Sequence, residues 1–136
     1  MNYLFAPESI IERQSILEQM TVTLEPDHRL EMFSDFDSFS ARLRLFSNPQ
    51  IIIMLGVGRS DIKNLLSLSE LIRDAAIIIL HSEDSEATIK LAIRLRPKFI
   101  GSLDTYVKEI IPIVKKLIQN QKARAQKILS VKELII

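Results

Sequence analysis

The chain has 136 residues, of which 47% are hydrophobic, so it is long enough for one domain with a continuous core and too short for two ordinary ones. Charged residues make up 26% and the formal net charge is +1, which excludes an intrinsically disordered chain or one driven to nucleic acid by bulk charge. The sequence has no cysteine and two histidines, which excludes disulfides, a cysteine nucleophile, and thiolate or histidine-based metal sites.

No apolar run approaches the roughly 20 residues that a helix needs to cross a bilayer. The first residues also lack the basic and long apolar regions of a secretory signal. We therefore expect a cytoplasmic protein without membrane contact, and no residue pattern calls for a cofactor.

The first part of the chain predicts two strand–helix pairs. Residues 3–5 form a short apolar run that ends at Pro7, and apolar side chains then recur at roughly helical spacing, at Ile10, Ile11, Leu17 and Met20. After a turn-rich stretch at residues 25–28, residues 30–33 alternate as a strand does, and Ser34 and Asp35 can cap a helix over residues 36–46. A hairpin between residues 22–24 and 30–33 remains an alternative.

The strongest signals are two β-branched runs, at residues 51–55 and 76–80. Neither run alternates with polar residues, a pattern typical of central strands that helices cover on both faces of a parallel sheet. Between them, Ser60 and Asp61 can cap one helix whose apolar face comprises Ile62, Leu65, Leu66 and Ile72.

The last part of the chain predicts two further helices around a fifth strand. Residues 82–85 combine a cap with acidic first-turn residues, and the helix through Ile89, Ala92 and Ile93 stops at Pro97. Phe99 and Ile100 begin the strand. Asp104 then opens a helix to about residue 129, which Pro112 should kink near Lys108; its apolar residues are Ile110, Ile111, Val114, Leu117 and Ile118.

Five strand–helix pairs in strict alternation imply parallel strands joined by right-handed crossovers. The expected fold is α/β: a flavodoxin-like three-layer α/β/α sandwich with a five-stranded parallel sheet of order 2-1-3-4-5 and an extended C-terminal helix. We expect the domain to span residues 1–120 and the helical extension residues 121–136.

Over about residues 2–120, this length and order of elements resembles the receiver domain of bacterial response regulators. In that family, an acidic pair after the first strand holds Mg²⁺ and an aspartate after the third strand accepts the phosphoryl group. The fourth strand ends in Thr or Ser, and the fifth in a Lys followed by Pro. In this sequence the corresponding positions hold Ala6 and Pro7 with Glu8 nearby, Leu55 or Gly56, His81 or Ser82, and Ser102 followed by Leu103.

The resemblance therefore implies a degenerate receiver without catalytic residues or a metal site, because the nucleophile and the Mg²⁺ ligands are missing. We expect a pseudo-receiver of two-component signalling that is not an enzyme and acts by phosphorylation-independent protein–protein contact. One alternative is a phosphorylatable receiver that uses Asp61, although six residues beyond Leu55 an aspartate is typically a helix cap.

A second alternative is a small anion or nucleotide site at residues 56–60, where backbone N–H groups and Arg59 could cradle an anion before a helix. A dinucleotide fingerprint would need a third glycine where Asp61 or Ile62 stands. The two glycines are also explained by a tight turn alone, and His81 without an acidic partner is typical of a structural histidine.

The C-terminal segment is basic, with Lys108, Lys115, Lys116, Lys122, Arg124, Lys127 and Lys132. No aromatic residue follows Tyr106, which argues against nucleic acid and for a solvated helix face. The apolar stripe nevertheless continues through Ala125, Ile128, Val131 and Ile135. We therefore expect a protein partner, or a homodimer through the last helix, at a face formed by Ile89, Ile93, Phe99, Ala125 and Ile128; Phe99 also matches the aromatic switch position of receivers.

Overall fold

The computed structural model describes residues 2–23, 30–45 and 49–135, with side chains described as far as residue 123. Strands and helices alternate along the described chain in the following order: β1 (Asn2–Phe5), α1 (Arg13–Thr23), β2 (Leu30–Phe33), α2 (Phe36–Leu45), β3 (Ile51–Val57), α3 (Arg59–Leu66), α4 (Ser69–Ile72), β4 (Ala76–His81), α5 (Glu86–Ile93), β5 (Phe99–Ser102), α6 (Leu103–Tyr106), the 3₁₀ helix η2 (Val107–Glu109) and α7 (Ile110–Ile135).

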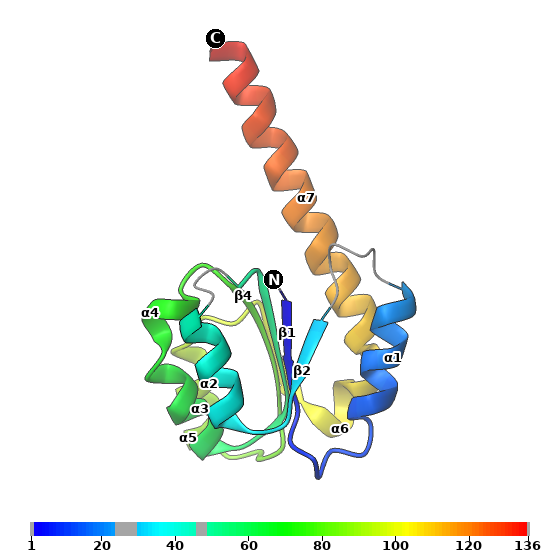
Figure 1. Ribbon diagram of the computed structural model, residues 1–136, viewed down its shortest axis with the longest axis vertical. Helices are drawn as coiled ribbons and strands as arrows, with labels where there is room; N and C mark the ends of the chain where they lie inside the picture. Colours follow the sequence, from blue (N-terminus) through cyan, green and yellow to red (C-terminus); the bar gives the residue numbers. More distant parts are fainter. Residues whose placement is uncertain (1, 24–29, 46–48, 136) are drawn as a thin grey trace.

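The five strands form one parallel sheet in the order β2-β1-β3-β4-β5. Helices α2, α3, α4 and α5 lie on one side of the sheet and α1, α6 and α7 on the other (Figure 1). The predicted flavodoxin-like α/β/α sandwich and its strand order are therefore confirmed. As expected from their uninterrupted apolar runs, β3 and β4 are central strands and every residue in them is buried.

Two apolar cores fill the space between the layers. The first joins alternate residues of the strands, such as Tyr3 and Ile52, to α2, α3, α4 and α5. The second joins the other residues of the same strands, such as Leu4 and Ile53, to α1 and α7. This division follows from the strand geometry, since successive side chains point to opposite faces of a sheet.

Two predicted features of the first part of the chain need correction. Helix α1 begins at Arg13, so Ile10 and Ile11 lie in the loop before it, and Ile11 is 91% exposed. The alternative hairpin is wrong, because Val22 is helical and β2 pairs with β1 in parallel. Leu24, Phe46 and the turn at residues 25–28 lie outside the described residues.

The helix predicted between β3 and β4 is in fact two helices, α3 and α4, separated at Ser67 and Leu68. The Ser67 hydroxyl donates a hydrogen bond to the carbonyl of Asn64, a local bond that competes with the helical pattern. Leu68 points into the same core as Ile62 and Ile72, so the apolar spacing continues across the break.

The predicted kink near Lys108 is confirmed as an interruption by η2 between α6 and α7. Pro112 lacks an N–H, and its ring clashes with the carbonyl four residues earlier, at Lys108. Beyond the interruption, α7 runs to Ile135 and extends past the sheet (Figure 1). The predicted boundary between residues 120 and 121 lies inside this helix. Within the described residues, no helix is both long and apolar enough for a membrane span.

Candidate functional site

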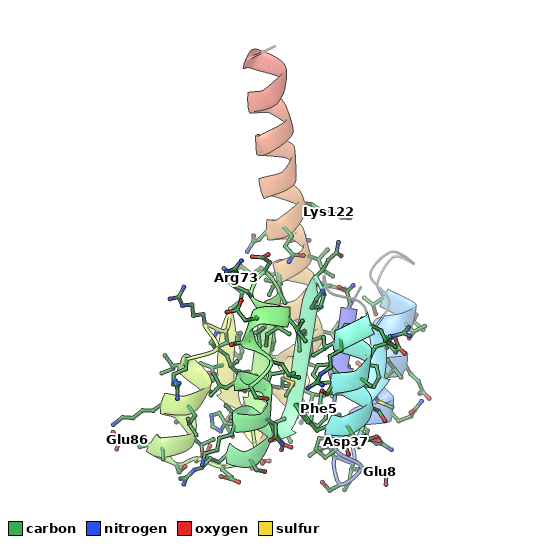
Figure 2. The ribbon with its side chains drawn as sticks, turned by 60° about the vertical axis from the view of Figure 1, so that its left-hand side comes forward. Phe5, Glu8, Asp37, Arg73, Glu86 and Lys122 are labelled. Carbon is green, nitrogen blue, oxygen red and sulfur yellow. The ribbon has the colours of Figure 1, made fainter. Side chains whose placement is uncertain are left out.

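The carboxyl edge of the sheet is where doubly wound folds bind ligands, and it holds the positions compared with the receiver pocket. After β1, Ala6 is fully buried and its N–H donates to the carbonyl of Phe33 at 2.9 Å. Pro7 is half-buried and Glu8 is exposed. Figure 2 shows Glu8 at the outer end of its loop, beyond Phe5. The place of the acidic pair is therefore taken by a buried apolar residue and a proline.

The end of β3 is closed by apolar side chains. Leu55 is fully buried, and Gly56 occupies a bulge in the β3–β4 pairing with a positive φ of 66°. A Cβ atom on Gly56 would lie 2.7 Å from Cγ1 of Ile10 and 3.5 Å from Cδ2 of Leu103. Ile10 comes from the loop before α1 and Leu103 from the start of α6, so side chains from two segments far apart in the sequence meet over the position compared with the phosphoacceptor.

At the end of β4, His81 is 5% exposed and its Nδ1 lies 3.3 Å from Oδ1 of Asp84. The geometry of this contact is not that of a hydrogen bond. The contact is therefore electrostatic when the histidine is protonated. It corrects the expectation that His81 has no acidic neighbour, although Asp84 itself is largely exposed.

The other two positions compared with the receiver pocket are serines at the ends of β4 and β5. Ser82 is exposed and its N–H donates to the carbonyl of Val57 at 3.0 Å. Ser102 is half-buried at the N-terminus of α6. Among the described residues, no three histidine or carboxylate side chains converge as metal ligands.

Two acidic side chains, those of Asp61 and Glu83, lie beside the loop at residues 56–60. The N–H of Gly58 donates to Oδ2 of Asp61 at 3.2 Å, so Asp61 caps α3 from its third position. A Cβ on Gly58 would lie 3.1 Å from Cδ of Glu83. A bound anion would compete with one carboxylate for a backbone donor and lie close to a second. This geometry explains Asp61 by capping and disfavours anion binding.

The cap predicted within residues 82–85 is part of a hydrogen-bonded group at the start of α5 whose other members were not predicted. Ser85 is the N-cap and accepts from the N–H of Thr88 at 3.1 Å. Thr88, which is fully buried, accepts from the Ser85 hydroxyl at 2.7 Å and donates to Oε2 of Glu83 at 3.2 Å. The Ser85-x-x-Thr88 spacing was the available signal. These bonds fix Glu83 beside Gly58.

Two groups near the sheet have displaced pKa values. Hydrogen bonds from Ser38 lower the pKa of Asp35, whose carboxylate accepts from the N–H of Ser38 at 2.8 Å at the start of α2. Burial raises the pKa of the Tyr3 hydroxyl, while the neighbouring Arg42 opposes the rise. Neither group lies at the carboxyl ends of β3 and β4, so we interpret both pKa changes as consequences of local packing and capping.

The residues of the predicted interaction face lie on α5, β5 and α7. Ile93 on α5 is 56% exposed and Ile89 is half-buried. Phe99 on β5 is half-buried and packs edge-on against Tyr106, with ring centroids 5.0 Å apart. A hollow of about 380 Å³ separates β5 from α7, and it is lined mainly by Ile78, Phe99, Ile113 and Leu117. Ala125 and Ile128 lie on α7, beyond the described side chains.

Comparisons with known proteins agree with this fold. A crystal structure from Burkholderia pseudomallei, described as a "putative pilus assembly-related protein", has 16% sequence identity and a TM-score of 0.53 over 74% of this chain and 75% of that chain. At that identity the similarity shows a shared fold. No family model and no curated protein matches the chain.

Proposed function

We propose that this chain is a receiver-like module of signal transduction that binds a protein partner without being phosphorylated and without catalysing a reaction. The observation that carries the proposal is the apolar closure over β3. Phosphoryl transfer to a receiver requires a carboxylate nucleophile and a bound divalent cation at this point. Here Ile10 and Leu103 cover Gly56 instead.

We place the interaction surface at the edge of the sheet formed by β5. β5 is an edge strand that pairs only with β4 within the described sheet. The hollow against Ile113 and Leu117 of α7 lies beside β5, and Ile93 is an exposed apolar residue of α5, the helix that precedes β5. Apolar hollows and exposed apolar side chains are typical of protein-binding surfaces. We define the β5 face as Ile89, Ile93, Phe99, Ile113 and Leu117.

Phosphorylation independence is tested by adding beryllofluoride and Mg²⁺, which together mimic the phosphoryl group on a receiver aspartate. Amide spectra of the labelled protein should show no specific, saturable shifts at residues 55–61. The intact mass should also be unchanged after treatment with acetyl phosphate. A phosphoryl adduct that disappears in Asp61→Ala would refute the proposal and establish Asp61 as a phosphoacceptor.

Partner binding through the β5 face is tested with a photo-cross-linking residue at position 93 in cells. The matched control carries the same residue at position 45, because Leu45 is also exposed, at 75%, and lies on α2 at the far side of the same helix layer (Figure 2). We expect an adduct from position 93 only, and the purified partner should lose binding to Ile93→Lys. Identical adducts at both positions, or none, would argue against the β5 face.

A further inference from the structure

Charges are segregated between the two edges of the sheet. The helices that connect the parallel strands run antiparallel to them, so their N-termini lie at the carboxyl edge and their C-termini at the amino edge. Helix dipoles favour anions at the N-terminal end and cations at the C-terminal end. Figure 2 shows Glu8, Asp37 and Glu86 at one end of the domain and Arg73 at the other.

We define the basic edge as Arg73, Arg94, Arg96 and Lys98, which come from the turns before β4 and β5. All four side chains are exposed. Among the described residues none of the four forms an ion pair. The basic edge is therefore a group of cations outside any ion pair at one end of the sheet, although two acidic residues, Glu70 and Asp74, lie close to it.

The basic edge is also concave. One hollow of about 340 Å³ is lined by Arg73, Arg96 and Lys98, and a second of about 290 Å³ by Arg73, Arg94 and Arg96. Leu117, Asn120 and Gln121 of α7 form one wall of the first hollow. A protruding acidic loop would thus enter a corner between α7 and the two basic turns.

Arg96 has an unfavourable backbone conformation. It follows the end of α5 with a positive φ of 53°, and its N–H donates to the carbonyl of Ile93 at 2.9 Å. Glycine is the usual residue in this left-handed position because it has no Cβ to strain. The backbone of Arg96 is therefore strained at a position whose side chain lines both hollows, and the helix dipole does not explain why an arginine stands there.

The complementary surface is on the chain itself. We define the acidic edge as Glu8, Asp37, Asp84 and Glu86, in the loops and first turns that follow β1, β2 and β4. The side chains of Asp84, just before α5, and Glu86, its first residue, are 75% and 83% exposed, although Glu86 forms an exposed ion pair with Lys90 at 3.0 Å and Asp84 lies 3.3 Å from His81. Arg59, at the start of α3, is an exposed cation that interrupts this edge.

We propose that the basic edge binds the acidic edge of a second copy of this chain, head to tail. Such a contact joins different surfaces, so it repeats into a ring or an open chain of copies. The hollows also contain the carboxylates of Glu70 and Asp74 and no aromatic residue. This mixed, aromatic-free lining fits an acidic protein loop better than a nucleic acid backbone.

The contact should be weak and sensitive to salt, because exposed ion pairs gain little individually and are screened by ions. Sedimentation velocity of the full chain is measured over a concentration series at about 0.01 M and about 0.15 M NaCl, where the Debye length is about 30 Å and about 8 Å. The sedimentation coefficient should rise with protein concentration at the lower salt and much less at the higher salt. Monomers throughout the series would overturn the proposal.

Charge reversal identifies the surfaces. Arg73→Glu with Arg96→Glu leaves two cations and two new carboxylates on the basic edge, whereas Asp84→Lys with Glu86→Lys leaves two carboxylates and two new cations on the acidic edge, so each variant loses one of the two complementary surfaces. Each variant alone should be monomeric, whereas an equimolar mixture should associate at low salt. Glu86→Lys alone, which leaves Asp84 beside His81, should weaken association in the same direction; far-UV circular dichroism verifies folding.

A matched control, Lys63→Glu with Lys115→Glu, carries the same change in net charge on exposed residues outside the basic edge. It should associate like the original chain. Association that persists in both reversed variants, or at the higher salt, would overturn the proposal and indicate apolar contact through α7. If the mixture fails to associate while the original chain does, head-to-tail pairing through these edges is also wrong.

Discussion

Substituting Gly56 with alanine tests the apolar closure over β3 directly. Gly56 has a φ of 66°, and a left-handed conformation costs an L-residue about 1–2 kcal/mol. The added Cβ would lie 2.7 Å from Cγ1 of Ile10, and such overpacking in a core costs about 1–3 kcal/mol. We therefore expect Gly56→Ala to lower the free energy of unfolding by about 2–5 kcal/mol.

The steric part of this loss depends on Ile10. In an Ile10→Ala background the clash is removed, so Gly56→Ala should cost only the conformational part, about 1–2 kcal/mol. The two substitutions should thus be less destabilising together than the sum of the single effects, as residues in contact usually are non-additive. Urea denaturation followed by far-UV circular dichroism measures all three variants.

Gly58→Ala is the matched control. Gly58 has a φ of −105°, and its Cβ would meet only the carboxylate end of the exposed Glu83 side chain, which can turn away with the loss of a single hydrogen bond from Thr88. Its cost should stay below about 1 kcal/mol. If Gly56→Ala is as mild as Gly58→Ala, or if its effect is unchanged in the Ile10→Ala background, then Ile10 does not close the end of β3.

Three further predictions concern single groups. Arg96→Gly should raise the free energy of unfolding by about 1 kcal/mol in urea denaturation, since it relieves the left-handed strain, while weakening self-association. Asp35→Ala should lower the thermal unfolding midpoint above pH 3.8, where the Asp35 carboxylate is ionised. Because hydrogen bonds lower the pKa of this carboxyl in the folded chain, the difference in midpoint between the variant and the original chain should be lost as the pH falls from 3.8 through the lowered pKa. A difference that stays constant over this range would contradict this. In Tyr106→Phe, ultraviolet titration should place the pKa of Tyr3 above 10.0, and the stability due to the buried neutral phenol should be lost as the pH rises through that pKa; a Tyr3 pKa at or below 10.0 would contradict this.

The sheet could be predicted from the sequence because its central strands carry an unambiguous pattern. Runs such as residues 51–55 and 76–80 contain no polar side chain, and such runs between helices fit a parallel sheet buried on both faces. The break between α3 and α4 could not be predicted in the same way. Leu65, Leu68 and Ile72 keep helical spacing across it, so the hydrophobic period is the same for one helix or two.

The residue types at the candidate site could be read from the sequence, but the side chains that cover them could not. Alignment by spacing identified Gly56 as unable to accept a phosphoryl group. Nothing in the local sequence indicated that Ile10, an apolar residue in a loop, would cover this position together with Leu103, which comes 93 residues later in the chain. Contacts between segments that are distant in sequence depend on tertiary packing, which the hydrophobic periodicity does not report.

The length of α7 turns small movements near the sheet into larger ones at its far end. Ile110, Val114 and Ile118 are buried, so the first turns of the helix are held firmly against the domain. From Ile118 to Ile135 the helix continues for about 25 Å at about 1.5 Å per residue. A tilt of about 10° at this support would move the tip by about 4 Å, so α7 can act as a lever between the sheet and whatever contacts its end.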